Sequence, residues 1–193
     1  MTGDNGGFTI DGVPASTYGV TLRYGPGQPM LPATRDRTVE IPGRAGAYWF
    51  DSDVGQRQFS LPCDFRDCAD AAALDVLIKA FARVLVDVYG KPRRLSLVFD
   101  DSPTITYTVR YSGEIPFDRA WVGCSEFTLN LVADEPFGRE DEEVATGTIT
   151  TSPGTLSVTG TCTVASPAKI CITNNGASPI AGFTVTIGGW TVL

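Results

Sequence analysis

The hydrophobic pattern of this chain changes its period once, and that change most restricts the possible fold. On both sides of it, short segments alternate apolar and polar residues, as in Phe59, Leu61 and Cys63, which is typical of half-buried β-strands. Between Asp70 and Tyr89 the apolar residues follow steps of three, one, three, four and three, as on one face of a helix. The apolar positions of this stripe are Leu74, Leu77, Ile78, Phe81, Leu85 and Val88. The sequence therefore predicts a mainly β (α+β) fold, an antiparallel β-sandwich flanked by one long helix at about 70–89.

Residues that favour helix ends occur on both sides of the stripe. Asp67 or Asp70 can cap the first turn by accepting backbone N–H bonds, and a negative charge there suits the helix dipole. Gly90 can adopt the left-handed conformation that ends a helix, and Pro92 prevents its continuation. Because a long exposed apolar stripe is unfavourable in water, we expect the helix to pack on the sheet or on a neighbouring subunit.

Strands are predicted before and after the helix. The segments before it are 8–13, which is a strand or a turn, 20–24, 35–41, 48–50 and 58–64; those after it are 95–99, 104–111 and 124–132. Segments 95–99 and 104–111 are expected to pair as a hairpin across the turn at 100–103. Pro42-Gly43-Arg44-Ala45-Gly46 is interpreted as a turn whose glycines need a positive φ.

The composition changes near residue 138, where a domain boundary is predicted. The acidic run Glu140–Glu143 leads into a segment rich in Thr, Ser and Gly. We expect domain 1–137 to be followed by 138–193, a small partial β-sandwich, short or incomplete, with strands centred on 156–158, 170–172 and 183–187. Asn174-Asn175-Gly176 is a strong turn signal between the last two. A piece of about 55 residues is marginal by itself, so it needs more chain or a partner.

The net charge of −7 and the pI of about 4.5 exclude several function classes. A nucleic-acid groove needs clustered Lys and Arg, and docking on anionic lipid also needs positive charge. The N-terminus has no signal segment, and no apolar run approaches the ~20 residues of a membrane span, so folding in a cytoplasm is expected. The five cysteines follow no framework spacing and are interpreted as reduced thiols.

The chain has no histidine, which removes His-based nucleophile pairs, His metal sites and the usual general base. Carboxylate-only chemistry remains open at Asp51 with Asp53, at Asp100 with Asp101 and at 140–143. Solvated turns and linkers are the favoured interpretation of all three.

Metal and cofactor sites are not predicted either. A calcium loop starting at Asp51 would place Gln56 and Pro62 where its turn Gly and bidentate Glu belong. Cys63 and Cys68 have no second pair at zinc-ribbon spacing, and no phosphate-cradling loop precedes a helix. Five aromatic residues could stack on sugars, but core or subunit interface is favoured: Tyr48, Trp49, Phe50, Trp121 and Trp190.

The order of motifs resembles one known family. Phe8–Val13 comes first; a strand then ends in "EIPGRAG" at 40–46; the lone helix and a hairpin follow; and Phe127–Leu131 leads to Asp134-Glu135-Pro136-Phe137. Over residues 8–137 this order is similar to the N-terminal domain of the siphophage distal tail protein family. The resemblance marks assembly or turn positions at Pro42, Gly43, Arg44, Gly46, Trp49, Asp134, Pro136 and Phe137.

The resemblance implies a structural role, with no enzymatic activity and no cofactor. It implies a tail-tube-like domain, six copies of which form a ring joining the tail tube to the tip or baseplate and the host-adhesion apparatus. The expected partners are the tail tube, the tip or baseplate hub and the tape measure protein. DNA would pass through a central channel as cargo. The protein would be assembled in the host cytoplasm and located at the tail tip of the virion. A galectin-like C-terminal domain would follow, here short or truncated. The alternatives are a tail-tube protein of the same fold and a carbohydrate-binding β-sandwich using Trp190 or Trp49.

Overall fold

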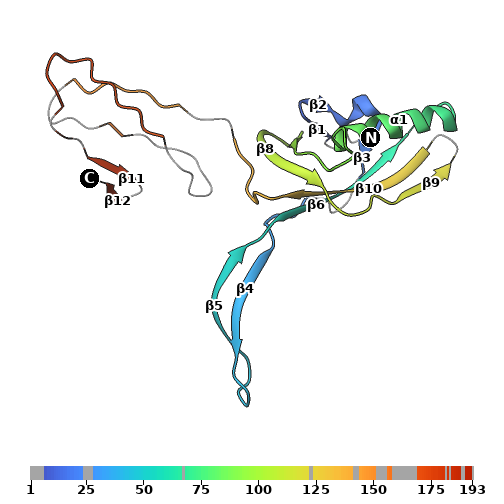
Figure 1. Cartoon of the computed structure of the whole chain (residues 1–193), viewed down its shortest axis with the longest axis horizontal. Helices are drawn as coiled ribbons and strands as arrows, with labels where there is room; N and C mark the ends of the chain where they lie inside the picture. The colour runs from blue at the N-terminus through green and yellow to red at the C-terminus, as the bar shows by residue number, and fades with distance from the viewer. Residues whose placement is uncertain are drawn as a thin grey trace. The chain divides into compact units, whose positions relative to one another are not determined.

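The structure is a computed structural model of the chain. It describes residues 7–23, 28–66, 68–121, 124–140, 144–150, 156–157, 169–180, 182, 184–187 and 190–192. The chain divides into two compact units, Met1–Glu142 and Glu143–Leu193 (Figure 1).

The first unit is built on one eight-stranded antiparallel sheet. Its neighbours follow the order β2-β1-β7-β8-β10-β6-β3, and β9 pairs with β10 beside this path. The strands are β1 (Phe8–Ile10), β2 (Val13–Pro14), β3 (Val20–Leu22), β6 (Arg57–Phe65), β7 (Leu95–Phe99), β8 (Ser102–Tyr111), β9 (Phe117–Trp121) and β10 (Cys124–Ala133). The predicted hairpin is confirmed as β7–β8, whereas β9 was not predicted.

The sheet bends over so that distant strands face one another across the core. In a flat sheet, β6 and β7 would lie about 14 Å apart, because three strand spacings separate them. The rings of Phe59 on β6 and Phe99 on β7 are 5.6 Å apart, and Phe59 is 5.1 Å from Tyr107 on β8. The buried core is therefore enclosed between two parts of one continuous sheet. The predicted mainly β fold with one helix is confirmed.

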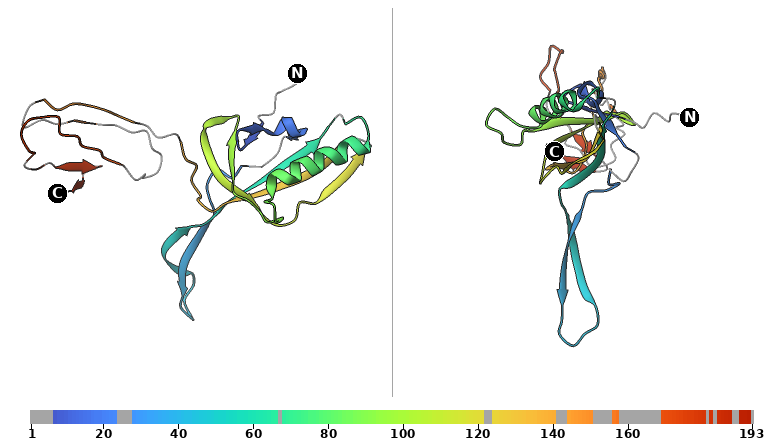
Figure 2. Two further views of the ribbon diagram at one scale, coloured as in Figure 1. Left: turned by 45° about the horizontal axis from the view of Figure 1, so that its top comes forward. Right: turned by 90° about the vertical axis from the view of Figure 1, so that its right-hand side faces the viewer.

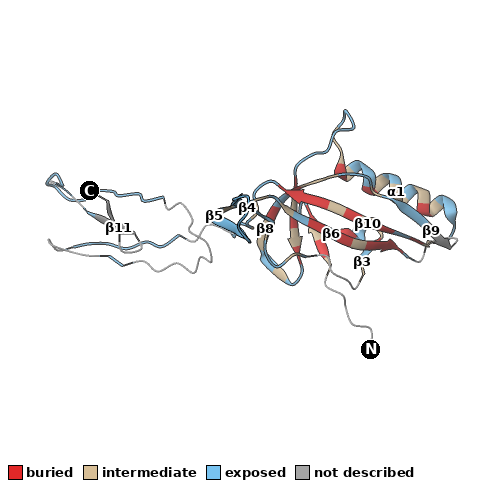
Figure 3. Ribbon diagram, turned by 90° about the horizontal axis from the view of Figure 1, so that it is seen from below, coloured by how far each residue is buried: buried red, intermediate tan, exposed pale blue. Residues whose placement is uncertain are grey.

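Helix α1 (Ala71–Leu85) packs on this sheet by the predicted stripe (Figure 2). Asp70 is the N-cap, and its Oδ1 accepts the backbone N–H of Ala73 at 2.7 Å. Leu74, Phe81 and Leu85 are buried (Figure 3). The ring of Phe81 lies about 6 Å from three others, those of Tyr18 on the short 3-10 helix η1 (Ala15–Tyr18), Phe65 and Phe127.

The helix ends earlier than predicted, and Val88 does not belong to its buried stripe. Val86 is already extended and bridges Pro92. Asp87 accepts the backbone N–H groups of Tyr89 and Lys91 with one carboxylate oxygen, at 2.9 and 2.8 Å. This local hydrogen bonding stabilises a tight turn in place of a further helical turn, so Val88 is 93% exposed.

Among the described residues, strands β4 (Thr34–Glu40) and β5 (Ala47–Val54) pair only with each other, and they project from the body of the first unit (Figure 1). Every residue of both strands is exposed except Ser52, which is half-buried. The strand predicted at 35–41 is confirmed as β4, whereas the core position, one of two options given for the aromatic residues 48–50, is wrong because these residues are exposed. Alternation of apolar and polar residues indicates a strand, but among the described residues no second sheet packs on β4 and β5 to bury one of their faces.

The second unit contains β11 (Val185–Ile187) paired with β12 (Trp190–Val192). Leu156, Ile170 and Ile172 are exposed and not in strands, contrary to expectation, while residues 158 and 183 lie outside the described residues. The turn signal at Asn174 is confirmed, because its Oδ1 accepts the Gly176 backbone N–H at 2.9 Å. Within the part of the second unit that is described, strands pair only in this short hairpin.

Candidate functional site

The β4–β5 hairpin, residues 34–54 and called the arm below, is the most unusual surface of the first unit. A protein of this size normally buries most large apolar side chains, and clustered exposed ones mark interaction surfaces. The arm exposes Val39, Tyr48, Trp49, Phe50 and Val54, and its tip exposes Ile41. Trp49 is 64% and Phe50 is 69% exposed.

The predicted glycine turn forms the tip of the arm. Arg44 donates its backbone N–H to the Ile41 carbonyl at 3.1 Å, and Gly43 has a φ of 85°. Proline at the second position and a glycine with positive φ at the third are the signature of a type II turn. Gly46 also has a positive φ, of 84°. The Arg44 guanidinium lies 4.1 Å from the centre of the Tyr48 ring, a cation–π contact that holds the tip side chain.

The register of the arm separates its side chains into two faces. Thr38 pairs with Trp49 and Val39 with Tyr48, and the register shifts by a bulge between Arg37 and Thr38. Residues that pair across an antiparallel ladder share a face. The Tyr48 face carries Arg35, Arg37, Val39, Tyr48, Asp51 and Asp53. The Trp49 face carries Thr34, Asp36, Thr38, Glu40, Ala47, Trp49, Ser52 and Val54.

The two faces differ in charge. On the Tyr48 face, Arg37 Nη2 lies 2.7 Å from Asp53 Oδ2, and the two basic residues are matched by two acidic ones. On the Trp49 face the charged residues are Asp36 and Glu40, both acidic. The Tyr48 face is therefore internally neutralised, whereas the Trp49 face combines negative charge with a large aromatic ring.

A hydrogen-bond relay fixes the indole on the Trp49 face. Trp49 Nε1–H donates to Ser52 Oγ at 3.0 Å, and the Ser52 hydroxyl donates to Asp36 Oδ1 at 2.6 Å. The carboxylate end of the relay makes the second bond charge-assisted. A preorganised aromatic side chain loses less conformational entropy on binding, which suits a docking residue.

The base of the arm is tied to the body at several points. The Gly55 backbone N–H donates to the Ala33 carbonyl at 2.7 Å, where the two chain segments meet. Arg57 Nη2 donates to the Pro29 carbonyl at 2.6 Å, and its guanidinium lies near the rings of Phe59 and Tyr107. These bonds fix where the arm leaves the core.

The structure separates the predicted positions into two groups. Pro42, Gly43, Arg44, Gly46 and Trp49 lie in the arm. Asp134, Pro136 and Phe137 lie outside the arm, in the segment that follows β10.

The side chain of Asp134 contacts the base of the arm. Its Oδ1 accepts a hydrogen bond of 2.8 Å from Nε2 of Gln56, which lies just beyond β5. Arg139 then exchanges two backbone hydrogen bonds with Thr106, each of 2.8 Å, which holds the segment after Asp134 against β8. Phe137 is partly exposed there. Asp134 thus supports the base, and it does not contact the tip.

Three residues of this surface were missed from the sequence: Asp36, Ser52 and Arg57. Asp36 and Ser52 are far apart along the chain and meet only because of the strand register. Arg57 looks like any polar position before Phe59, and no local signal indicates its contact with the Pro29 carbonyl.

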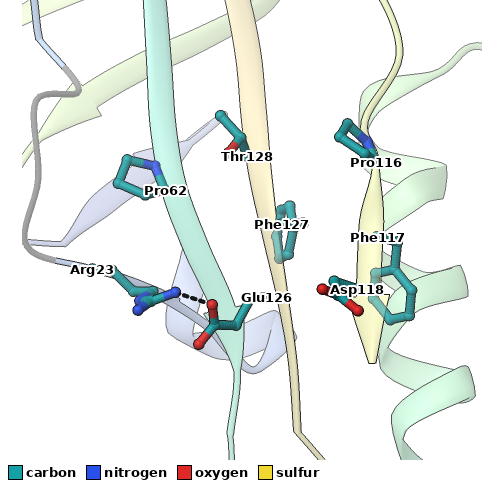
Figure 4. A pocket seen from close by; sticks show the side chains of 8 residues that line it. All are labelled: Arg23, Pro62, Pro116, Phe117, Asp118, Glu126, Phe127 and Thr128. Carbon is teal, nitrogen blue, oxygen red and sulfur yellow. Dashed lines mark ion pairs between the residues drawn. The ribbon is translucent and has the colours of Figure 1, made fainter. Parts of the chain in front are cut away.

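A shallow hollow of about 290 Å³ lies elsewhere, beside β3, β6, β9 and β10 (Figure 4). Its charged residues include Arg23 and Glu126, which form an ion pair with each other, and Asp118 (Figure 4). Among the described residues, no group of three potential His, Cys, Asp or Glu ligands could hold a metal ion. No helix in the described part is long and apolar enough to cross a membrane. The run at 141–143 lies outside the described residues.

Comparison with known proteins points to phage tails. Residues 14–133 match the family described as the phage tail protein RIFT-related domain. The fold is similar to a crystal structure of the Dit protein of phage SPP1, described as a paradigm of the hub adsorption apparatus in phages infecting Gram-positive bacteria. The TM-score is 0.57 at 18% sequence identity, over 68% of this chain and 50% of that protein. This likeness establishes a shared fold, and the chain spans half the length of that protein. No curated protein matches the chain.

Proposed function

The chain belongs to the phage tail protein RIFT-related domain family, and on that premise we propose that it is a ring-forming subunit of a siphophage tail tip. Six copies form a ring that joins the tail tube to the tip or baseplate and the host-adhesion apparatus. The single observation that carries this proposal is the exposed arm, which holds apolar side chains in water unless another subunit covers them. The likeness of the fold to a phage hub protein supports the same role.

A ring explains why an apolar arm can be useful without causing aggregation. In a cyclic assembly each copy uses one surface to contact the next copy and a different surface to receive the previous one. The contact closes after a fixed number of copies, so no arm remains uncovered. The tie between Ala33 and Gly55 and the Arg57 contacts give the arm a fixed exit from the core, which closure requires.

The charge of the chain also suits a channel for DNA. With a net charge of −7, the subunit does not attract phosphates strongly, so DNA can pass without sticking. In this proposal DNA is cargo in transit, and the lasting partners are the tail tube, the tip or baseplate hub and the tape measure protein.

We assign ring formation to residues 1–137 and treat 138–193 as a separate C-terminal β domain. The subunit would be assembled in the host cytoplasm and reside at the tail tip of the virion. The proposed role is structural and uses neither a catalytic residue nor a cofactor.

The experiment that tests this proposal combines negative-stain microscopy with native mass measurement of the full chain. Rings with a central hole and a mass of six copies are expected. Monomers alone, even after tail-tube and hub partners are added, would contradict the proposal.

The same images distinguish a tail-tube protein of the same fold, since that protein would form long tubes in place of single rings. The carbohydrate-binding alternative retains one supporting observation, the exposed ring of Trp49. A glycan array compares the wild type with Trp49→Ala, and specific binding lost in the variant would favour that alternative.

A further inference from the structure

The turn that follows α1, residues 87–94, is a second exposed apolar surface of the first unit. Its tip carries Val88, which is 93% exposed, and Tyr89, which is 82% exposed. The Asp87 carboxylate accepts two backbone N–H groups of the turn, and Gly90 donates its N–H to the Asp87 carbonyl at 3.0 Å. The two side chains are therefore presented outward by a preorganised backbone.

Unpaired positive charge surrounds this tip. Lys91 and Arg94 are exposed, and neither side chain forms an ion pair with any residue in the described ranges. Arg93 differs, because it is paired with Asp11. In a chain of net charge −7, this is a local basic and apolar surface.

The Trp49 face of the arm has the opposite charge and a similar apolar character. Its charged residues are Asp36 and Glu40. Asp36 accepts the Ser52 hydroxyl, while the side chain of Glu40 makes no hydrogen bond or ion pair with a described residue. The Tyr48 face lacks this complementarity, because its Arg37 and Asp53 already pair with each other.

Within one chain these two surfaces do not meet. The arm is exposed along both strands, and its strands are in extensive contact only with each other. Val88 and Tyr89 are also exposed. A contact between the Trp49 face and the 87–94 turn therefore has to join different copies. Two different surfaces can meet head-to-tail, which is the arrangement that a closed ring of more than two copies uses.

We propose that the Trp49 face of the arm docks on the 87–94 turn of a second copy of this chain. The Trp49 ring packs against Val88 and Tyr89, while Glu40 faces Lys91 and Arg94. This inference rests on the proposed function, namely that copies of the chain assemble with one another, and it specifies the two surfaces that meet.

The test is a charge exchange in the full chain. Glu40→Lys and Arg94→Glu are made singly and together, and the dissociation constant for self-association is measured by sedimentation at low and high salt. We expect each single change to weaken assembly about tenfold, and the exchanged pair to return to within about threefold of the wild type. Added salt should weaken assembly of the wild type by screening the charge pairs, whereas in Glu40→Lys, where like charges face each other, added salt should strengthen assembly.

The control variants replace a basic residue with Glu outside the two surfaces that are proposed to meet. Arg35→Glu lies on the Tyr48 face of the same arm, and Lys79→Glu lies on the exposed side of α1. Both are expected to stay within about twofold of the wild type. Far-ultraviolet circular dichroism and thermal unfolding establish that every variant is folded.

Two kinds of failure are distinguishable. If the wild type forms rings but Glu40→Lys and Arg94→Glu behave like the controls, or the exchanged pair is no better than the singles, the docking proposal is overturned and the ring stands. If the wild type stays monomeric with tail partners present, the ring and the docking proposal both fail.

Discussion

Removing the arm should separate folding from assembly. The change replaces residues 34–54 with a short Gly-Ser turn between Ala33 and Gly55. We expect the first unit to remain folded and self-association to be lost. The physical reason is that the arm buries none of its own residues and contributes nothing to the core.

The magnitude follows from two features of the structure. An isolated two-stranded hairpin is marginally stable in water, so its removal costs little. The Gly55 backbone N and the Ala33 carbonyl O are already 2.7 Å apart, so a short turn can join the segments without strain. Shortening the connection from about 20 residues to about 4 lowers the entropy cost of loop closure by about 1.5 kcal/mol. The free energy of unfolding should therefore stay level or rise by up to about that amount.

Urea unfolding, followed by circular dichroism, gives the stability, and sedimentation gives the assembly state. The matched variant is Trp49→Ala, which keeps the arm and removes its largest ring; it should also leave stability unchanged and weaken assembly. A loss of more than about 3 kcal/mol on arm removal would show that the arm packs on the body, contrary to this structure. Full rings without the arm would refute its role as a subunit contact.

Two further predictions concern the core. Phe81→Ala should lower the free energy of unfolding by about 3–5 kcal/mol, because Phe81 is buried among three rings. The control Val76→Ala, at an exposed position of the same helix, should change the free energy of unfolding by less than about 0.5 kcal/mol. Equal losses in urea titrations of the two variants would disprove the packing of α1. Burial, with a smaller contribution from Asp64, raises the pKa of Cys63 to about 12, against an ordinary value of 9.0. The unfolded thiol ionises above pH 9 while the buried one stays protonated, so stability should fall between pH 9 and 12 by up to about 1.4 kcal/mol per pH unit. Cys63→Ala should remove this part of the slope, and an unchanged slope in unfolding titrations would contradict the assignment.

Local pattern was sufficient for the secondary structure of the core. Phe59, Leu61 and Cys63 alternate and form the buried face of β6. Asp70 caps the helix, and Leu74, Phe81 and Leu85 are buried as the helical spacing predicts. In each case the signal and the structure it specifies lie within a few residues of each other, where hydrogen bonding and side-chain direction are set by the backbone itself.

The candidate site depended on contacts that the pattern does not contain. Val39 lies in an alternating segment, as Leu61 does. It is nevertheless exposed, because among the described residues no second layer covers the arm. Val88 continues the helical stripe, yet the Asp87 carboxylate diverts the chain into a turn. Nothing in the sequence brings Ser52 to Asp36, since that contact needs the bulged register of the arm.

The sequence by itself determined the strands of the first unit other than β9, the helix, and the position of the glycine turn. Only the tertiary structure decided that residues 34–54 leave the core, which residues of β4 share a face with Trp49, and that Val88 and Tyr89 point into solvent. Periodicity encodes which side of an element is apolar, since that follows from backbone geometry. Whether that side is buried depends on which element packs against it. The order of the strands in the sheet and the place where the arm leaves the core decide this, and residues adjacent in the sequence do not.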